Sequence, residues 1–147
     1  MTDIVTPEQR HRMMSGIKGK DTKPELTVRK ELFRRGFRYR LHDKKLPGKP
    51  DLVFPKYKAV IFVNGCFWHK HDCKFFKWPK SNQEFWKKKI TRNIERDARN
   101  RDQLSIDGWR VKTIWECALK GKNSDGIGKE IDKLSIWLLN KNHTGID

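Results

Sequence analysis

The pattern of apolar and polar positions predicts a helix early in the chain. Residues 21–25 (Asp-Thr-Lys-Pro-Glu) are typical of a helix start, because a capping residue precedes a proline in the first turn and an acidic residue follows. We expect Leu26, Leu32 and Phe33 on the buried face of this helix and Gly36 at its end.

Three strands are predicted after this helix. Phe37, Tyr39 and Leu41 alternate with polar residues, as in a half-buried strand. Residues 51–54 (Asp-Leu-Val-Phe) are predicted to form the second strand. Residues 59–63 are continuously apolar, which is typical of a central strand covered on both faces. The connections between the three are short, so an antiparallel meander is favoured.

A long helix, a fourth strand and a C-terminal helix are predicted in the second half. The sequence Ser-Asn-Gln-Glu at 81–84 indicates a capping box, and this helix is expected to end at Leu104 or Ser105, with Gly108 in the following turn. One stripe of it carries Trp86, Ile90, Asn93, Ile94, Asp97 and Leu104. Residues 109–115 predict a strand. Apolar residues at helical spacing mark the last helix: Ile127, Ile131, Leu134 and Leu138.

The order of these elements predicts an α/β (α+β) fold with a mixed sheet flanked by helices, because a strand–helix–strand crossover follows the meander. A chain of 147 residues suits one hydrophobic core, so we place a single domain at residues 21–147. Residues 1–20 carry few apolar side chains. We expect them to form an arm, with a short helix starting near Pro7, that orders on a partner.

Positive charge is the strongest signal in the composition. The 34 Lys and Arg residues outnumber 18 Asp and Glu, which gives a formal net charge of +16 and favours nucleic acid as the partner. A basic cluster on the long helix is expected to supply some phosphate contacts: Lys87, Lys88, Lys89, Arg92, Arg96 and Arg99. An anionic membrane surface is the weaker alternative, since no basic amphipathic helix dominates. No apolar run approaches the ~20 residues of a membrane span, so we expect a soluble, cytoplasmic protein.

The loop at 66–73 (Cys-Phe-Trp-His-Lys-His-Asp-Cys) indicates a zinc site, because zinc prefers four tetrahedral thiolate and imidazole ligands. Two ligand sets fit the sequence. One is local and consists of Cys66, His69, His71 and Cys73. The other replaces His69 with Cys117, and the cysteine count favours it, since Cys117 is otherwise an unexplained thiol near a strand end.

A hard divalent cation is the second expected cofactor. Hydrolysis of a phosphodiester needs a cation that activates water and neutralises charge, and magnesium takes carboxylate, water and phosphate oxygens as ligands. Asp51, at the start of a predicted strand, is a credible ligand, although an acidic residue there is more often part of a turn.

Several segments, in one order, strongly resemble the very-short-patch repair endonucleases of the restriction-endonuclease-like superfamily. They are LPGKPD at 46–51, GCFWH at 65–69, NIERD at 93–97, GWRV at 108–111 and WECAL at 115–119. The likeness extends from about Arg10 to Gly121. It implies a restriction-endonuclease-like core and an enzyme that nicks one DNA strand at the thymine–guanine mismatch left when 5-methylcytosine deaminates.

The same resemblance implies the role of each site residue. Asp51 and the backbone carbonyl of Val63 would bind magnesium, Glu25 would support the water shell of a second metal, and His69 would act as general base or orient water. The structural zinc would be held by Cys66, His71, Cys73 and Cys117. The DNA contacts would come from Met14 in the arm, from Phe67, Trp68 and Trp86 as wedges, and from Lys89 and Asn93 at the mismatch.

Two departures from the expected patterns concern the end of the central strand. The superfamily usually carries an acidic residue, any residue and a lysine there, and residues 62–64 (Phe-Val-Asn) lack both groups. The repair family often has Thr and His where this chain has Val63 and Asn64. A backbone carbonyl ligand tolerates Val63, while Asn64 can still bond a phosphate or a water.

Alternatives remain open at this stage. The three aromatic residues could pack in the core instead of contacting DNA; the two interpretations are balanced for Trp86, and exposure is favoured for Phe67 and Trp68 because they lie in a polar loop. The protein could be a zinc-braced DNA-binding module without catalysis, or another metal-dependent nuclease of the superfamily. Nicking one strand requires only a monomer, and the partners would be duplex DNA and other repair proteins.

Overall fold

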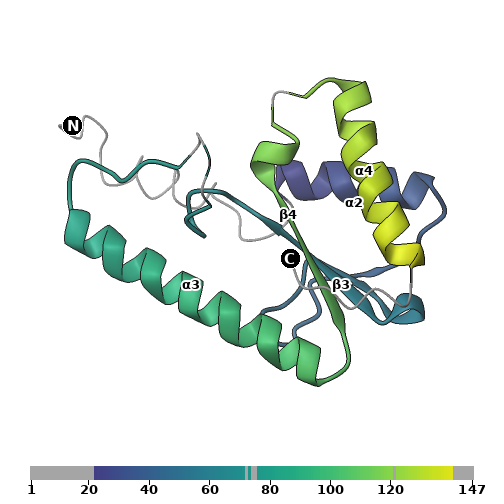
Figure 1. Cartoon of the computed structure of the whole chain (residues 1–147), viewed down its shortest axis with the longest axis horizontal. Coiled ribbons are helices and arrows are strands. Elements are labelled where there is room, and N and C mark those ends of the chain that lie inside the picture. The colour runs from purple at the N-terminus through teal and green to yellow at the C-terminus, as the bar shows by residue number, and fades with distance from the viewer. Residues whose placement is uncertain (1–21, 72, 74–75, 121, 141–147) are drawn as a thin grey trace, which may run out of the picture.

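The helices and strands follow the predicted order (Figure 1). The structure is a computed structural model that describes residues 22–71, 73, 76–120 and 122–140. The predicted arm, including Pro7 and Met14, lies outside these residues. The elements are α2 (Lys23–Arg34), β1 (Arg40–Leu41), β2 (Leu52–Phe54), β3 (Ala59–Asn64), α3 (Gln83–Ile106), β4 (Arg110–Trp115) and α4 (Ser124–Leu139), with single 3-10 turns η1 (Pro55–Tyr57) and η2 (Glu116–Ala118).

The four strands form one mixed sheet in the order β1-β2-β3-β4, which confirms the predicted fold class. The first two pairings are antiparallel, as a meander requires. β4 joins β3 in parallel through the α3 crossover, with Asn64 opposite Trp115 at the end of the ladder. β3 is therefore the central strand, as its continuous apolar sequence predicts.

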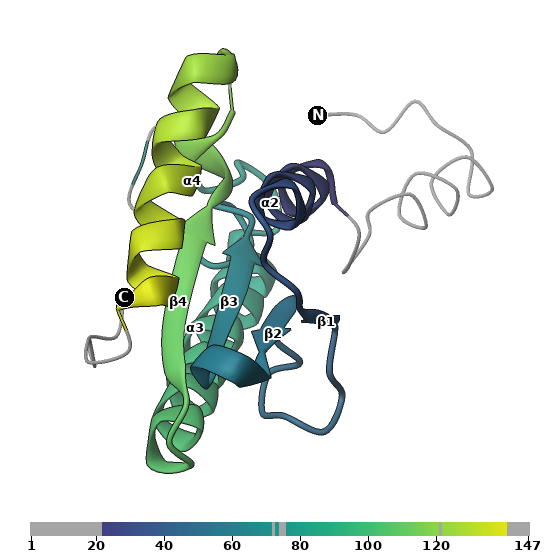
Figure 2. The same ribbon diagram turned by 90° about the vertical axis from the view of Figure 1, so that its right-hand side faces the viewer.

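Helices cover both faces of the sheet (Figure 2). On one face, residues of α2 and α4 pack with inward residues of the strands: the cluster includes Val28, Leu32, Leu52, Ile61 and Leu138. On the other face, Leu104 of α3 packs against one residue from each of the last three strands: Val53, Val60 and Val111. Within the described residues, no helix is both long and apolar enough to cross a membrane.

The buried face of α2 differs from the prediction. Leu32 is buried, but Leu26 and Phe33 are 36% and 53% exposed, and Glu25 and Val28 take the buried positions instead. The period of the helix explains the difference, because positions 25, 28 and 32 share one side and 26 and 33 point away. The ring of Phe33 is covered by the guanidinium of Arg38, 3.8 Å from its centroid.

The first strand is shorter than its alternating sequence predicts, because the chain around it is used to end α2 and to start a turn. Phe37 donates its backbone N–H to the Leu32 carbonyl, past the left-handed Gly36 that ends the helix. Only Arg40 and Leu41 pair with β2. Leu41 is 41% exposed on this edge strand rather than buried.

The long helix begins at the expected place but without the predicted capping box. Asn82 is the cap residue, its backbone is left-handed, and its side chain makes no capping hydrogen bond. The helix continues to Ile106, one or two residues beyond the predicted end. Only Ile90 and Leu104 of the predicted stripe are buried, and Ile94 is 38% exposed. In Figure 1 the N-terminal part of α3 extends past the sheet, so few of its side chains can reach the sheet, although Ile90 is buried.

Arg110 fixes the end of α4 from inside the molecule. Its guanidinium donates hydrogen bonds to the carbonyls of Trp137, Leu138 and Asn140 and to that of Tyr57, over distances of 2.8–3.2 Å. A cation at a helix C-terminus satisfies carbonyls that lack helical partners and interacts favourably with the helix dipole. Burial lowers the pKa of Arg110. This contact ties the last helix to the turn that precedes β3.

Candidate active site and metal centre

The register of the sheet brings distant polar residues to one edge. β2 runs antiparallel to β3, so Asp51, which precedes β2, lies beside the end of β3, where its Oδ2 accepts a hydrogen bond of 2.7 Å from the backbone N–H of Val63. β3 and β4 are parallel and their ladder ends at Asn64 and Trp115. Cys66 and Cys117 each follow two residues later, so both leave the sheet at the same edge.

A cavity of about 1320 Å³ opens at this edge between α2, α3 and the loop after β3. Asp51, Val63, Asn64 and His69 line it together with Asp97 of α3. Its basic lining residues are Lys23, Lys44, Lys49, Arg96 and Arg101. Cationic side chains around such a cavity can hold the phosphate backbone of a nucleic acid. A metal-binding carboxylate among them can then lie close to the phosphate that is cleaved.

The surroundings of the Asp51 carboxyl favour its neutral form. Burial, and the nearby Glu25 carboxyl, raise the pKa of Asp51 from 3.8 to about 7, although the Val63 N–H works in the opposite direction. One oxygen of each carboxyl and one nitrogen of His42 lie within 4.8 Å of one another. Two carboxyls this close have the oxygen donors that a divalent-cation site requires.

Glu25 reaches this cluster from the buried side of α2. Its side chain is 2% exposed, and its Oε2 accepts from Arg29 at 3.1 Å and contacts Nε2 of His42 at 2.8 Å. The sequence identified Glu25 only through the family resemblance, since an acidic residue in a first helical turn commonly serves the helix dipole. His42 was missed, because nothing in the chain order indicates that the residue after β1 meets α2.

His69 is held from α3. Its Nδ1 is hydrogen-bonded to the Asp97 carboxylate, and both side chains line the cavity. Asp97 was expected on the inward stripe of the long helix, but its partner could not be predicted, since 28 residues separate the two in the sequence. A carboxylate on Nδ1 fixes the orientation and tautomer of an imidazole and leaves Nε2 able to accept a proton.

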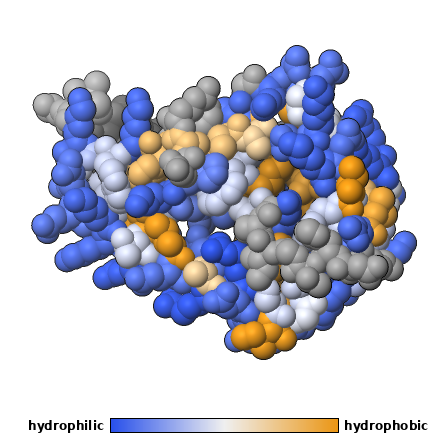
Figure 3. Space-filling view, in the orientation of Figure 1, coloured by the Kyte–Doolittle hydropathy of each residue, from blue (hydrophilic) through white to orange (hydrophobic). Residues whose placement is uncertain are grey.

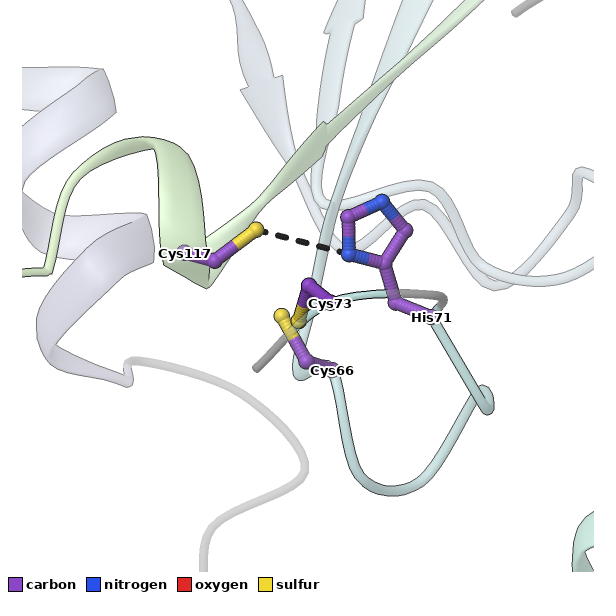
Figure 4. Close-up of side chains that lie close together, drawn as sticks. All are labelled: Cys66, His71, Cys73 and Cys117. Carbon is purple, nitrogen blue, oxygen red and sulfur yellow. Dashed lines mark hydrogen bonds between the residues drawn. The ribbon is translucent and has the colours of Figure 1, made fainter. Parts of the chain in front are cut away.

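Three cysteines and one histidine converge beside this cavity (Figure 4). The sulfur atoms of Cys66, Cys73 and Cys117 and a ring nitrogen of His71 all lie within 4.8 Å of one another. His69 is not in this group, so the geometry gathers the second of the two ligand sets that the sequence allows. Three thiols and one imidazole are a donor set that fits zinc.

Neighbouring residues hold His71 and Cys66 of this cluster in position. The ring of His71 stacks on Trp115 at a centroid distance of 4.2 Å, and its Nδ1 lies 3.4 Å from the sulfur of Cys117. The backbone N–H of Cys66 donates to Glu116 at 3.0 Å. Burial and the neighbouring thiols raise the pKa of Cys66 to about 12, and burial also raises that of Cys117.

The aromatic residues form a half-buried cluster rather than either of the two predicted extremes. Phe67 lies 5.2 Å from Trp68 and 5.4 Å from Trp86, and the two tryptophan rings are 5.7 Å apart. Trp86 therefore packs on the loop and not on the sheet core. Phe67 and Trp68 line the cavity, so part of each ring faces it.

Asn93 and Lys89, the two expected mismatch contacts on α3, differ in their surroundings. Asn93 donates to the backbone carbonyl of Trp68 at 2.9 Å and accepts from Arg96 at 2.9 Å, so it anchors the aromatic loop. Lys89 is exposed. Figure 3 shows hydrophilic side chains gathered over α3, as the basic cluster predicts. Asn64 is 8% exposed at the cavity wall.

Comparisons with known proteins agree with this geometry. Residues 2–75 match the model of the family described as DNA mismatch endonuclease Vsr. The chain is 52% identical to the type II nicking enzyme V.NmeAIP of Neisseria meningitidis, over 83% of this chain and 87% of that protein. It is 40% identical to the DNA mismatch endonuclease Vsr of Escherichia coli, over 94% of this chain and 88% of that protein. The chain belongs to the Vsr family of DNA mismatch endonucleases.

Proposed function

We propose that this protein nicks one strand of duplex DNA at a T:G mismatch by magnesium-assisted hydrolysis. Family membership makes the chain a DNA endonuclease, and relatives are named as mismatch endonucleases and nicking enzymes. The observation that carries the proposal is the placement of Asp51 and His69 on the wall of one cavity that is lined by basic side chains. A non-catalytic DNA-binding module would leave both residues without a role.

Asp51, with the backbone carbonyl of Val63, would hold magnesium, and Glu25 would support the water shell of a second metal. The fit rests on the crowded Glu25 and Asp51 carboxyls, whose repulsion a divalent cation would relieve. Bound there, magnesium supplies Lewis-acid chemistry: it stabilises charge that develops on the phosphate oxygens. The chain itself orients Asp51 through the N–H of Val63, which leaves the second carboxylate oxygen outside that bond.

His69 would act as the general base. The Asp97 carboxylate accepts a hydrogen bond from Nδ1–H of His69, so the lone pair on Nε2 can take a proton from the attacking water. The imidazolium that forms is stabilised by the same carboxylate, as in other nucleophile-activating pairs. Asp97 is thus assigned as the orienting partner of the base.

The cluster of Cys66, His71, Cys73 and Cys117 would hold a structural zinc. Phe67, Trp68 and His69 all lie between the first two of these ligands in the chain, so a metal there would fix the loop that carries the base and the aromatic rings. A loop with few core residues gains most from such a cross-link.

The mismatch would be recognised by insertion of aromatic side chains. Phe67 and Trp68 would unstack the duplex with support from Trp86, and a mismatched step is easier to open than a paired one. Met14 would enter from the arm, which we propose to be residues 1–20 ahead of a single domain at 21–147. Lys89 and Asn93 would contact the mismatch. We further propose a cytoplasmic monomer that works with other repair proteins.

Replacing Asp51 with Asn tests the proposal directly. The variant keeps an acceptor for the Val63 N–H but loses the charge that holds the cation, so single-turnover nicking of a T:G duplex should fall on the order of 10³-fold or more, since metal stabilisation is worth several kcal/mol. Gel-shift affinity for the same duplex should change little, because phosphate contacts and aromatic wedges supply binding. Asp107→Asn, beyond the end of α3, is the matched control and should cut normally. Undiminished magnesium-dependent nicking by the Asp51 variant would refute the assignment.

Replacing the proposed zinc ligand Cys117 and replacing the proposed general base His69 should have different effects. Cys117→Ser should lose zinc and melt at a lower temperature, because a tetrahedral site missing one ligand is opened. His69→Ala should keep one zinc per chain and its melting temperature, yet lose about 10²–10⁴-fold in the nicking rate, the range for a general base. Metal analysis of the purified variants decides the outcome. Zinc loss from His69→Ala would make His69 a zinc ligand. Full zinc content in Cys117→Ser would remove Cys117 from the zinc site.

The raised pKa of Asp51 predicts a pH dependence of stability in the magnesium-free protein. Asp51 titrates near 3.8 when unfolded and near 7 when folded, so its protonation favours the fold at low pH and this contribution is lost as pH rises from about 4 through 7. Asp51→Asn has no such loss, so the melting temperature of the wild type should fall relative to the variant between pH 5 and pH 8.

Added magnesium should then raise the melting temperature of the wild type at pH 8 and leave the variant unchanged. Zinc remains bound in both proteins, so thermal unfolding curves recorded with and without magnesium isolate the Asp51 site. If the melting temperatures of the wild type and Asp51→Asn change with pH in the same way, the raised pKa of Asp51 does not affect stability and the prediction is wrong.

A further inference from the structure

His42 is the third member of the cluster with Glu25 and Asp51, and the function proposed above gives it no role. Its Nε2 lies 2.8 Å from Oε2 of Glu25. Its backbone N–H donates to the carbonyl of Asp51 at 3.2 Å. One residue thus contacts both segments that supply the acidic groups, α2 through its side chain and the start of β2 through its backbone.

The backbone of His42 is held in an unusual conformation. Its φ of +48° lies in the left-handed region, which residues other than glycine rarely adopt. Such a conformation persists where surrounding contacts fix it, and it commonly occurs at functional sites. Here the turn directly after β1 directs the imidazole toward α2 instead of continuing the edge strand.

Glu25 needs such a contact to be held in one position. Its carboxyl is buried, and a glutamate side chain has enough rotatable bonds to place the group in several ways. Arg29 contacts the same Oε2 from one turn along α2, at 3.1 Å. Arg29 is on the same helix as Glu25, so it would move together with that carboxylate. His42 approaches from a different element, and the two donors together fix the direction of the carboxylate.

We propose that His42 is a positioning residue for the catalytic cation site. Its Nε2–H donates to Glu25 and holds that carboxylate beside Asp51, so that the acid that supports the water shell is already in place when a divalent cation binds. His42 acts through Glu25 and does not itself contact the cation. The inference rests on the proposed function, because it concerns how the same metal site is prepared. Partners that orient a metal-binding group typically change metal affinity 10–100-fold when they are removed.

Two substitutions separate the hydrogen bond from the unusual backbone. Asn tolerates left-handed φ well but its amide is too short to reach Glu25. The longer Gln side chain can place an amide N–H near the position of Nε2. Binding of Mn²⁺, followed by electron paramagnetic resonance, and the Mg²⁺ concentration for half-maximal single-turnover nicking measure the effect.

His42→Asn should weaken Mn²⁺ binding about 10–100-fold and shift the Mg²⁺ midpoint upward by a similar factor, with nicking largely restored at saturating Mg²⁺. His42→Gln should stay within about threefold of the wild type in both measurements, by the same reasoning on a retained donor. Zinc content, melting temperature and affinity for a T:G duplex should be unchanged in both variants. A wild-type midpoint in His42→Asn, or equal losses in the two variants, would overturn the proposal.

Two further results would also overturn it. Loss of zinc from His42→Asn would make the role a general structural one. A nitrogen coupling to Mn²⁺ that is present in the wild type and absent in His42→Gln would make His42 a ligand instead. Mn²⁺ binding that does not depend on Asp51 would refute the proposed function and this inference with it, whereas Asp51-dependent binding that is unaffected in His42→Asn would refute this inference alone.

Discussion

The parallel pairing of β3 with β4 is the contact on which the rest of the site depends. It aligns Asn64 with Trp115, so the chain leaves both strands at one edge and continues into Cys66 and Cys117. Glu116 reinforces this alignment by accepting the backbone N–H of Cys66. A shift of one residue would turn the alternate side chains to the opposite face and separate the four metal-binding groups. The register of one strand pair therefore decides whether a metal centre can exist.

The loop that begins at Cys66 contributes little to the core, and two other parts of the molecule hold it in place. One is the proposed zinc. The other is α3, where Asn93 donates to the carbonyl of Trp68 and Asp97 is hydrogen-bonded to Nδ1 of His69. This explains why a helix of 24 residues is mostly polar. Its inward stripe beyond the sheet meets functional groups of the loop instead of a hydrophobic core.

The two proposed cation sites divide the chemistry by ligand type. Thiols and an imidazole gather at the end of the parallel strand pair and suit a cation that stays bound. Carboxyls gather where the antiparallel strand begins, and burial, with a smaller contribution from the Glu25 carboxyl, raises the pKa of Asp51 to about 7. A fold that holds such a site gives up some stability in the metal-free state, which is the usual relation between a prepared active site and stability.

Local sequence predicted the parts of the structure that local physics determines. The order of elements and the central strand at 59–63 follow from apolar periodicity, and Cys117 was placed with the metal-binding loop because its thiol had no other use. The errors lie where a partner is distant. The roles of His42 and Asp97 depend on contacts across 17 and 28 residues, whereas Phe33 is exposed because it points away from the buried side of α2.

Selectivity for the mismatch is the most direct test of the account as a whole. Single-turnover cleavage should be followed separately on the two labelled strands of duplexes that differ only in a central T:G or C:G pair. The account predicts a magnesium-dependent nick in one strand of the T:G duplex and at least about 10²-fold slower cutting of the matched duplex, since unstacking a paired step costs a few kcal/mol more. Equal cutting of both duplexes, or of both strands, would contradict it.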